Sequence, residues 1–433
     1  MNNKLTINEM YDIYKITRSN KRRSEDSVEF EIEFEKYLTT LIKEINERNY
    51  TSSGNYTFIV NEPTRNGCRE VFAAELAKRI MHHYINEHLN EIMEKVLIAN
   101  TFNNRKGKGV LKAVNTIKDE IRRVSNNYKN DCWVIKWDLK AYFMCVKHDI
   151  INTMIQELID KNYQGNDKEI IKWVVKEAIN ANPQNNCYRK SQEWKWDTIE
   201  PHKSLFNQPA GQGGAIGFLP WQMFINYYHN EIDHWLTDEE KFSFIRFVDD
   251  MLIITDNKEY VLNKIIPELR ERYKKYNITI QERKFYCQHY SKGVKFCGVT
   301  IKYDRLYPNH RVICNMHNKI KRFNKITYKF NLHVMDFCNT LNSYFGLMNH
   351  MNAMNVIYQA ISMINIKWWD YMQWNPDRKI VEPKPHLDFL HQLEEKYGID
   401  MFDDIHSKRK RKKRKKKYFT DSHQKLIYKK LKK

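Results

Sequence analysis

The sequence of 433 residues lacks the patterns that would place a protein in a membrane or outside the cell. It has no run of 18 apolar residues, and its first ten residues, MNNKLTINEM, lack the apolar core of a signal peptide. Its eight cysteines include no Cys-x-x-Cys pair and no Cys/His set at zinc-binding spacing. We therefore expect a soluble cytoplasmic protein with reduced thiols, no disulfide framework and no membrane partner.

Acidic residues are nearly absent from the C-terminal end. Residues 408–433 hold 15 Lys or Arg and one Asp, which accounts for +14 of the formal net charge of +20. The ten consecutive basic residues at 408–417 repel one another, so we expect this tail to be disordered alone. It should bind the phosphates of structured RNA or single-stranded DNA. Its candidate nucleic-acid-binding residues are Lys408, Arg409, Arg411 and Arg414.

Two adjacent carboxylates, Asp249 and Asp250, lie between the apolar runs 244–248 and 251–254. This pattern predicts a β-hairpin with buried flanks and an acidic turn. An upstream apolar strand ends in a third carboxylate, Asp138. Strands that end in carboxylates are typical of sites that hold two Mg²⁺ ions for in-line phosphoryl transfer. An Asp-Asp pair alone is also common in solvated turns, and the third carboxylate is what favours metal binding.

These residues resemble the palm of a reverse transcriptase. The box Phe247-Val248-Asp249-Asp250 is similar to the aromatic-x-Asp-Asp motif, and Asp138 is similar to the first palm carboxylate. The resemblance covers about residues 60 to 365 and is closest to bacterial enzymes of diversity-generating retroelements and of related unclassified, defence-associated groups. It implies a bacterial cytoplasmic enzyme with two Mg²⁺ ions, for which Mn²⁺ could substitute. Their implied ligands are Asp138, Asp249, Asp250 and the main-chain carbonyl of Leu139.

The resemblance also implies the fold, which is α+β in the form of a right hand. Its parts are fingers, a palm with an antiparallel sheet, and a helical thumb. The expected boundaries are an N-terminal helical extension at 1–55, fingers at 56–130, a palm at 131–305 with an insertion at about 151–210, a thumb at 306–400 and a basic tail at 401–433. No ribonuclease H carboxylate set, maturase-like zinc pattern or integrase motif follows the thumb.

The basic, glycine-rich stretch 104–114 does not have the spacing of a Walker phosphate loop. Its glycines let backbone N–H groups approach a phosphate, and its basic residues supply positive charge, although alone it would be a generic surface loop. Similarity to the second fingers motif implies that Arg105 binds the incoming triphosphate, and that Lys106 and Lys108 bind phosphate or template. Arg79 is a candidate substrate-binding residue because its helix resembles the first fingers motif. Basic helices of this kind are otherwise usually solvated.

Residues around the nucleotide are implied in the same way. Phe143 resembles the aromatic gate that crowds a ribose 2′-OH and favours dNTPs, although an aromatic here could equally belong to the core. Gly217 and Gln222 match a signature of diversity-generating enzymes in a glycine-rich turn that lets backbone approach a nucleotide. Trp221 stands where that signature has Ser. It either contacts the template and restricts the product sequence, or it packs beneath the fingers.

Three further residues resemble parts that act on the primer and the leaving group. Lys284 matches the lysine that approaches the leaving pyrophosphate, which makes it a candidate general acid; a lysine at a strand end is otherwise usually a surface residue. Phe296 and Gly298 lie in a stretch similar to the primer-grip hairpin, where glycine would let the primer backbone come close.

The implied function is an RNA-directed DNA polymerase that adds dNTPs to a primer. The residues around Trp221 and the basic tail favour an antiphage-defence enzyme that works with a dedicated non-coding RNA and makes restricted or repetitive DNA. The alternatives are the mutagenic enzyme of a diversity-generating retroelement and a catalytically silent nucleic-acid-binding scaffold, which three intact carboxylates disfavour. Expected partners are an RNA template or structured RNA, the DNA product and dNTPs, while a partner protein or a homo-oligomer stays open.

Overall fold

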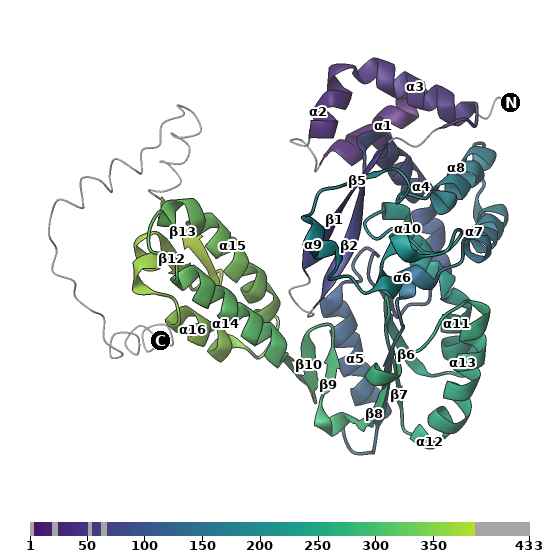
Figure 1. Ribbon diagram of the computed structural model, residues 1–433. Coiled ribbons are helices and arrows are strands. Elements are labelled where there is room, and N and C mark those ends of the chain that lie inside the picture. Colours follow the sequence, from purple (N-terminus) through teal and green to yellow (C-terminus); the bar gives the residue numbers. More distant parts are fainter. Residues whose placement is uncertain (1–3, 20–24, 51–53, 62–66, 386–433) are drawn as a thin grey trace, which may run out of the picture. The chain divides into compact units, whose positions relative to one another are not determined.

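The computed structural model describes residues 4–19, 25–50, 54–61 and 67–385 (Figure 1). The chain divides into two compact units, one up to Lys292 and one from Gly293. The basic tail, with its four candidate residues, and the last part of the expected thumb lie outside the described residues. None of the helices within the described ranges has the length and apolar character needed to cross a bilayer.

Three helices precede the first sheet: α1 (Ile7–Arg18), α2 (Glu25–Ile32) and α3 (Phe34–Asn46). The start of α1 is fixed by Thr6, whose hydroxyl oxygen accepts a hydrogen bond from the backbone N–H of Glu9 at 3.4 Å. Met10 and Ile13 lie one turn apart and are buried, so α1 presents one apolar face. The helix packs on α4 (Leu76–Val96), the longest helix of this unit among the described residues.

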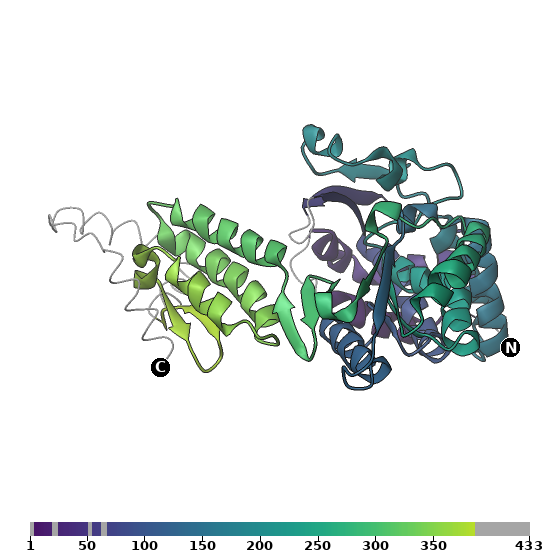
Figure 2. The same cartoon turned by 90° about the horizontal axis from the view of Figure 1, so that it is seen from below.

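The first sheet has the order β2-β1-β5, with β1 (Asn55–Asn61), β2 (Cys68–Ala74) and β5 (Cys187–Arg189). Strands β1 and β2 are antiparallel, whereas β5 arrives from the insertion and pairs parallel to β1. Figures 1 and 2 show the teal segment of β5 alongside β1. The buried carboxylate of Glu70 on β2 accepts hydrogen bonds from Ser204 Oγ at 2.7 Å and from the Leu205 N–H at 3.0 Å. The insertion is therefore held to this sheet by a buried polar contact.

The central sheet has the order β3-β6-β7-β4-β8. Its strands are β3 (Thr101–Phe102), β4 (Trp133–Asp138), β6 (Ser243–Phe247), β7 (Asp250–Thr255) and β8 (Tyr286–His289). All neighbouring pairs are antiparallel except the short edge pair β3 and β6. The expected antiparallel sheet of an α+β fold is therefore confirmed, with one parallel edge strand added.

Both faces of the central sheet are buried, as the nearly continuous apolar strands indicate. Trp137, Phe244 and Ile253 belong to the main core of the unit, and α13 (Ile266–Lys275) contributes Leu269 to the same core. Ile245 and Leu252 alternate with these residues and are also inaccessible to solvent. Helix α5 (Val110–Val124) packs on β6 and β7. Figure 1 shows α5 on one side of the sheet and α13 on the other.

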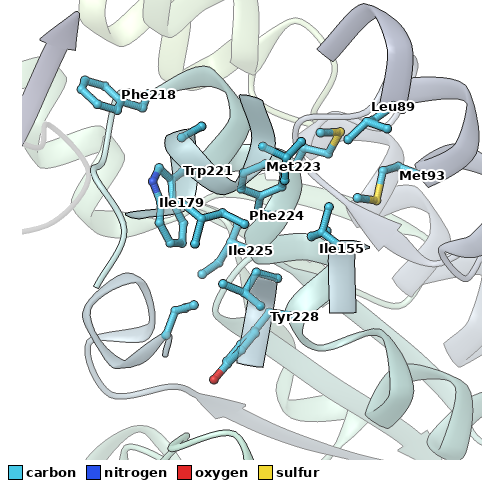
Figure 3. Packing of buried hydrophobic residues seen from close by; sticks show 14 of the residues in the cluster. Leu89, Met93, Ile155, Ile179, Phe218, Trp221, Met223, Phe224, Ile225 and Tyr228 are labelled. Atoms are coloured by element: carbon cyan, nitrogen blue, oxygen red, sulfur yellow. The ribbon is translucent and has the colours of Figure 1, made fainter. Parts of the chain in front are cut away.

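Seven further α-helices of this unit lie within the described residues. They are α6 (Tyr142–Cys145), α7 (His148–Asn162), α8 (Lys168–Asn180), α9 (Glu193–Trp196), α10 (Leu219–Tyr228), α11 (Asn230–His234) and α12 (Lys258–Tyr260). Figure 3 shows how side chains of α10 meet residues of α4, α7 and α8.

The second unit begins with an antiparallel sheet of β9 (Val294–Phe296), β10 (Val299–Lys302) and β11 (Arg305–Pro308). Its helices are α14 (His310–Asn324), α15 (Phe330–Met348) and α16 (Met354–Ser362), followed by the hairpin β12 (Met372–Asn375) and β13 (Ile380–Pro383). Figure 2 shows these helices side by side. Trp368 is completely buried at the centre of their own core.

Candidate active site

The structure brings the three predicted carboxylates to one end of the central sheet. Strand β4 ends at Asp138, which is directly opposite Asp250 in the register of β4 and β7. Asp249 lies in the loop that joins β6 to β7, and its carbonyl oxygen accepts a hydrogen bond from the Leu139 N–H at 3.1 Å. Backbone hydrogen bonding therefore fixes the main-chain positions of all three acids relative to one another.

The loop between β6 and β7 contains only Val248 and Asp249, because Phe247 pairs with Asp250. Val248 has a φ of 56°, a conformation that β-branched residues strongly avoid. Two-residue hairpins use positive φ at the first central position because it matches the twist of the strands. The hairpin thus holds a strained residue, at a cost of about 1–3 kcal/mol, directly beside the carboxylates.

Two lysines lie against the carboxylates. Lys284 Nζ is 2.6 Å from Asp138 Oδ2, and Lys136 Nζ is 3.0 Å from Asp250 Oδ1. Burial, and then the negative charge of Asp249, raise the pKa of Asp138, while its hydrogen bond with Lys284 opposes this rise. Asp138 therefore lies close to the negative charges of two other acids, and a bound cation would offset that repulsion.

This donor set fits divalent magnesium. Carboxylate oxygens are the ligands that Mg²⁺ prefers, and Asp138 is only 4% exposed while its carboxyl group is repelled by two neighbouring acids. The residues that would hold the ions are Asp138, Asp249 and Asp250, with the main-chain carbonyl of Leu139 as a further predicted ligand.

The predicted nucleotide gate, Phe143, lies in the short helix α6 just after the strand that carries Asp138. Its ring is half-buried and packs against the main core. Its carbonyl oxygen accepts a hydrogen bond from the Gly214 N–H at 2.8 Å, and the Val146 carbonyl accepts one from the Gly213 N–H at 2.8 Å. The glycine-rich turn is therefore tied to the segment that follows Asp138. The structure brings together two motifs that lie about 70 residues apart in the sequence.

Gly217 is required by a close backbone approach. It has a φ of +106°, and a Cβ atom at this position would lie 2.3 Å from the carbonyl oxygen of Phe72 on β2. The Phe72 N–H also donates to the Ile216 carbonyl at 2.8 Å. The turn is thus fastened to the first sheet, and Gln222 follows it, half-buried, on α10.

Trp221 points into the protein interior and is 2% exposed (Figure 3). Its ring lies 5.6 Å from that of His148 and 6.1 Å from that of Phe224, and a Cβ atom on Gly214 would collide with it. These contacts bury Trp221 beneath the glycine-rich turn, and they do not test the expected packing beneath the fingers. A contact between Trp221 and nucleic acid stays a prediction that would require this packing to open.

The basic candidates of the fingers are arranged in different ways. The side chain of Arg105 is 5% exposed, and its guanidinium donates to Glu94 at 2.9 Å and to the carbonyl oxygens of Ile98 and Thr101. Arg79 forms an ion pair with Asp26 at 3.2 Å. These two arginines therefore have partners within the protein, and their predicted contacts with the substrate would replace those partners.

The two lysines of the same loop differ from each other. Lys106 is exposed, whereas Lys108 donates to the Ala99 carbonyl and lies 5.5 Å from the centre of the Phe102 ring.

In the second unit lie the two residues assigned to the primer grip. Phe296 is 1% exposed, and Gly298 has a φ of +83° at the turn between β9 and β10. Their predicted contact with a primer stays a prediction.

Sequence reasoning missed a buried polar network under the hairpin. Arg246 and Asp233 are both inaccessible to solvent and are joined by hydrogen bonds of 2.6 to 3.1 Å. Asp233 also contacts His229 Nδ1 at 2.6 Å, and Arg246 donates to the Asn226 carbonyl at 2.8 Å. Two signals could have revealed it. Asn226, His229 and Asp233 share one helical face by their spacing, and Arg246 interrupts a buried apolar strand.

The network continues to β4, the strand that ends at Asp138. His229 Nε2 lies 2.9 Å from the Tyr273 hydroxyl, and that hydroxyl accepts a hydrogen bond from Trp137 Nε1 at 3.1 Å. Trp137 directly precedes Asp138, and Arg246 is three residues from Asp249. One buried network therefore reaches β4, which ends at Asp138, and β6, which leads into the turn with Asp249.

Comparison with known proteins gives a family and a set of similar folds. The family model described as reverse transcriptase (RNA-dependent DNA polymerase) matches residues 64–301. No curated protein matches the sequence.

The solved structures similar to this chain include two telomerases. Apo telomerase from Candida tropicalis shares 12% identity over 72% of this chain and 55% of that chain, with a TM-score of 0.45. Telomerase from Candida albicans, in complex with a fragment of telomeric RNA, shares 9% identity over 75% of this chain and 62% of that chain, with a TM-score of 0.41. The chain spans little more than half the length of the telomerases it matches.

Proposed function

The chain belongs to the reverse transcriptase (RNA-dependent DNA polymerase) family, whose model matches more than half of it, and we propose on this premise that it extends a primer with dNTPs along an RNA template. The reaction would join the primer 3′-OH to the α-phosphate of a dNTP and release pyrophosphate.

The observation that carries this proposal is the meeting of Asp138, Asp249 and Asp250 at one end of the central sheet. Asp138 and Asp250 are register partners, and Asp249 occupies a strained two-residue turn beside them. A nucleic-acid-binding scaffold would have no need to hold three repelling carboxylates together. The arrangement supports catalysis over the scaffold alternative.

The residues would divide the work as follows. Two Mg²⁺ ions would be held by Asp138, Asp249, Asp250 and the Leu139 carbonyl. When bound, they would make the primer 3′-OH more acidic and would stabilise the leaving pyrophosphate. Lys284, whose Nζ already lies at the carboxylates, would donate a proton to the departing pyrophosphate. Phe143 would crowd the ribose 2′ position, and Gly217 and Gln222 would lie against the nucleobase.

The basic side chains would bind the charged parts of the substrate. We assign the triphosphate to Arg105, a less specific contact with the substrate to Arg79, and phosphate or template contacts to Lys106 and Lys108. Of these four, Lys106 is the exposed one, and it has no hydrogen bond or ion pair with any of the described residues that substrate binding would have to replace. Trp221 would act from beneath the 211–217 turn, whose backbone it supports.

We propose further that the enzyme works in antiphage defence with a dedicated, structured non-coding RNA and makes restricted or repetitive DNA. The support is the sequence of the tail, whose ten consecutive basic residues at 408–417 suit a polyanion bound through phosphates. Because Trp221 is buried, it supports a restricted product only through the shape of the turn above it.

The experiment is nucleotide incorporation by protein purified with its retained nucleic acid, supplied with Mg²⁺ and each labelled dNTP singly and together, without added template. The control is Asp249→Asn/Asp250→Asn, and the matched control is Asp160→Asn, which neutralises an exposed carboxylate paired with Lys172. We expect incorporation in the wild type and in Asp160→Asn, and none in the double variant.

Sequencing of the product distinguishes the biological roles. A defined or repetitive product without added template supports a dedicated RNA and the defence role. Synthesis only on an arbitrary primed RNA, with errors at template adenines, would instead indicate a diversity-generating enzyme. Equal signals from the wild type and the double variant would refute the assignment of the three carboxylates.

A further inference from the structure

A second cluster of metal-ligating side chains lies far from the carboxylates in the sequence and belongs to three different helical segments. Glu9 is in the first turn of α1, His88 is in the middle of α4, and Asp167 directly precedes α8. One ligand atom of each side chain lies within 4.8 Å of the others. Figure 1 shows α1, α4 and α8 at the same end of the first unit.

The distances in this cluster are wrong for hydrogen bonds and suitable for a shared cation. His88 Nε2 lies 3.5 Å from Glu9 Oε1 and 3.6 Å from Asp167 Oδ2. An N–H···O hydrogen bond spans about 2.7–3.2 Å, so neither separation qualifies. Ligand atoms about 2.0–2.2 Å from a tetrahedral metal ion lie about 3.3–3.6 Å from one another. Both separations from Nε2 fall in that range.

The imidazole of His88 is oriented as a ligand. Its Nδ1 lies 2.8 Å from the Tyr84 carbonyl oxygen, which can only accept, so Nδ1 carries the proton and donates it. In the neutral ring, Nε2 then presents its lone pair to the two carboxylates, an arrangement that requires a cation between them. A histidine that donates its other N–H to a backbone carbonyl is the usual arrangement at protein metal sites.

The carboxylate of Asp167 is oriented by two tyrosine hydroxyls. The hydroxyl of Tyr84 donates to its Oδ2, and the hydroxyl of Tyr163 donates to its Oδ1 at 2.7 Å. Each carboxylate oxygen keeps a further lone pair, so both tyrosines orient the group without blocking it. The Asp167 side chain is 19% exposed and that of Glu9 is 34% exposed, which leaves a path for an ion.

We propose that Glu9, His88 and Asp167 form a binding site for a divalent transition-metal ion that fastens α1 to α4 and α8. One imidazole nitrogen and two carboxylate oxygens suit Zn²⁺ or Mn²⁺ better than Mg²⁺, which prefers oxygen ligands alone. The site is separate from the polymerase chemistry, and its effect is to attach the N-terminal helices to the fold. Ion binding that requires the folded arrangement stabilises that arrangement.

The competing explanation is a protonated His88 that forms an ion pair with the two acids and binds no metal. The two explanations differ in metal content, so the test is Zn²⁺ binding. Full-length protein carrying Asp249→Asn/Asp250→Asn, which removes ions at the candidate active site, is stripped with chelator and titrated with Zn²⁺ by calorimetry. The same titration is made with His88→Ala and with Glu9→Gln, a conservative change on a partly exposed side chain.

The matched control is His234→Ala. His234 forms an exposed pair with Asp238 but has no second acid among its ion-pair partners in the described residues. We expect the parent protein and His234→Ala to bind one more Zn²⁺ per chain than His88→Ala, and Glu9→Gln to weaken that site. His88→Ala should lower its affinity at least about 100-fold, since loss of an outer partner alone costs about 10- to 100-fold.

Two readouts complete the test. Zn²⁺ should raise the thermal midpoint of the parent and of His234→Ala but not of His88→Ala, and X-ray absorption should show only nitrogen and oxygen ligands with one imidazole. Zinc binding of equal stoichiometry and affinity in the parent and His88→Ala would overturn the proposal. So would a parent protein that binds no Zn²⁺, which would leave the protonated ion pair as the explanation.

Discussion

The guanidinium of Arg246 and the carboxylate of Asp233 form a bidentate ion pair that is completely buried. Arg246 Nε lies 3.1 and 2.8 Å from the two carboxylate oxygens, and Nη2 lies 2.6 Å from one of them. Arg246 is on β6, one strand of the hairpin that carries Asp249 and Asp250, whereas Asp233 is on α11. The pair thus connects the hairpin to the helices behind the sheet.

Arg246→Met should lower the free energy of unfolding by about 3–5 kcal/mol, because it leaves the Asp233 charge buried without its main partner. The double change Arg246→Met/Asp233→Leu should cost less than Arg246→Met alone. Urea unfolding followed by circular dichroism measures both. Arg270→Met serves as the control, since its exposed pair with Glu282 should contribute less than about 1 kcal/mol. A smaller loss for Arg246→Met than for Arg270→Met would contradict this prediction.

Lys284→Met should slow nucleotide addition by about 10²–10⁴-fold, the usual contribution of a positioned acid or base. The loss should shrink with a triphosphate whose leaving group is more acidic, because such a group needs less proton donation. Single-turnover kinetics measure both rates. Arg283→Met, a change at the exposed neighbouring cation, should keep a rate close to that of the wild type. An equal loss of rate with both kinds of leaving group would show that Lys284 supports Asp138 rather than donating a proton.

Phe143→Ala should admit ribonucleotides, since it removes the ring assigned to the ribose 2′ position. The expected change is in the ratio of kcat/KM for dNTP and rNTP, with little change for the dNTP alone. A half-buried ring also contributes to packing, so the free energy of unfolding should be measured on the same sample. Unchanged sugar discrimination in a folded variant would assign Phe143 to the core.

Lys78 should make the stability depend on pH. Burial lowers the pKa of this lysine from 10.5 to about 8. Between pH 8 and 10.5 the unfolded chain then binds more protons than the folded chain, so its contribution to the free energy of unfolding rises with pH. The full difference is about 3 kcal/mol at 1.36 kcal/mol per pKa unit. The stability advantage of Lys78→Met over the wild type should therefore be larger at pH 7 than at pH 10.

Chemical unfolding of both proteins at the two pH values measures this difference directly. Subtracting the variant from the wild type removes the contribution of the other titrating groups, including the buried tyrosines. An advantage that is the same at both pH values would mean that Lys78 keeps an ordinary pKa in the folded protein.

Gly217→Ala should destabilise the protein more than Gly211→Ala. Both glycines have positive φ, but only at Gly217 would the added Cβ meet backbone, the Phe72 carbonyl oxygen at 2.3 Å. Gly211→Ala should cost about 1–2 kcal/mol from backbone strain alone, and Gly217→Ala should cost more and loosen the turn next to Gln222. Thermal unfolding of the two variants is the measurement, and equal shifts would contradict the close approach.

The sequence by itself determined the parts of this protein that depend on local pattern. Apolar strands ending in acids predicted β4, β6 and β7, and the Asp249-Asp250 pair predicted the hairpin between two of them. Resemblance supplied the family, the fold class and the candidate residues, because those motifs are short and lie within single elements. The reverse transcriptase family and the α+β fold are confirmed, while the narrower bacterial groups and the assigned role of each site residue stay predictions.

Only the tertiary structure decided which side chains are available and which are already engaged. Burial of Trp221 depends on a residue far away in the sequence, His148. Arg105 and Arg246 instead bond residues of neighbouring elements, which only the folded chain brings to them. The Glu9, His88 and Asp167 cluster joins three segments that no spacing rule connects. Local pattern fixes the type of element and the face on which a residue lies, but packing between distant elements decides what that face meets.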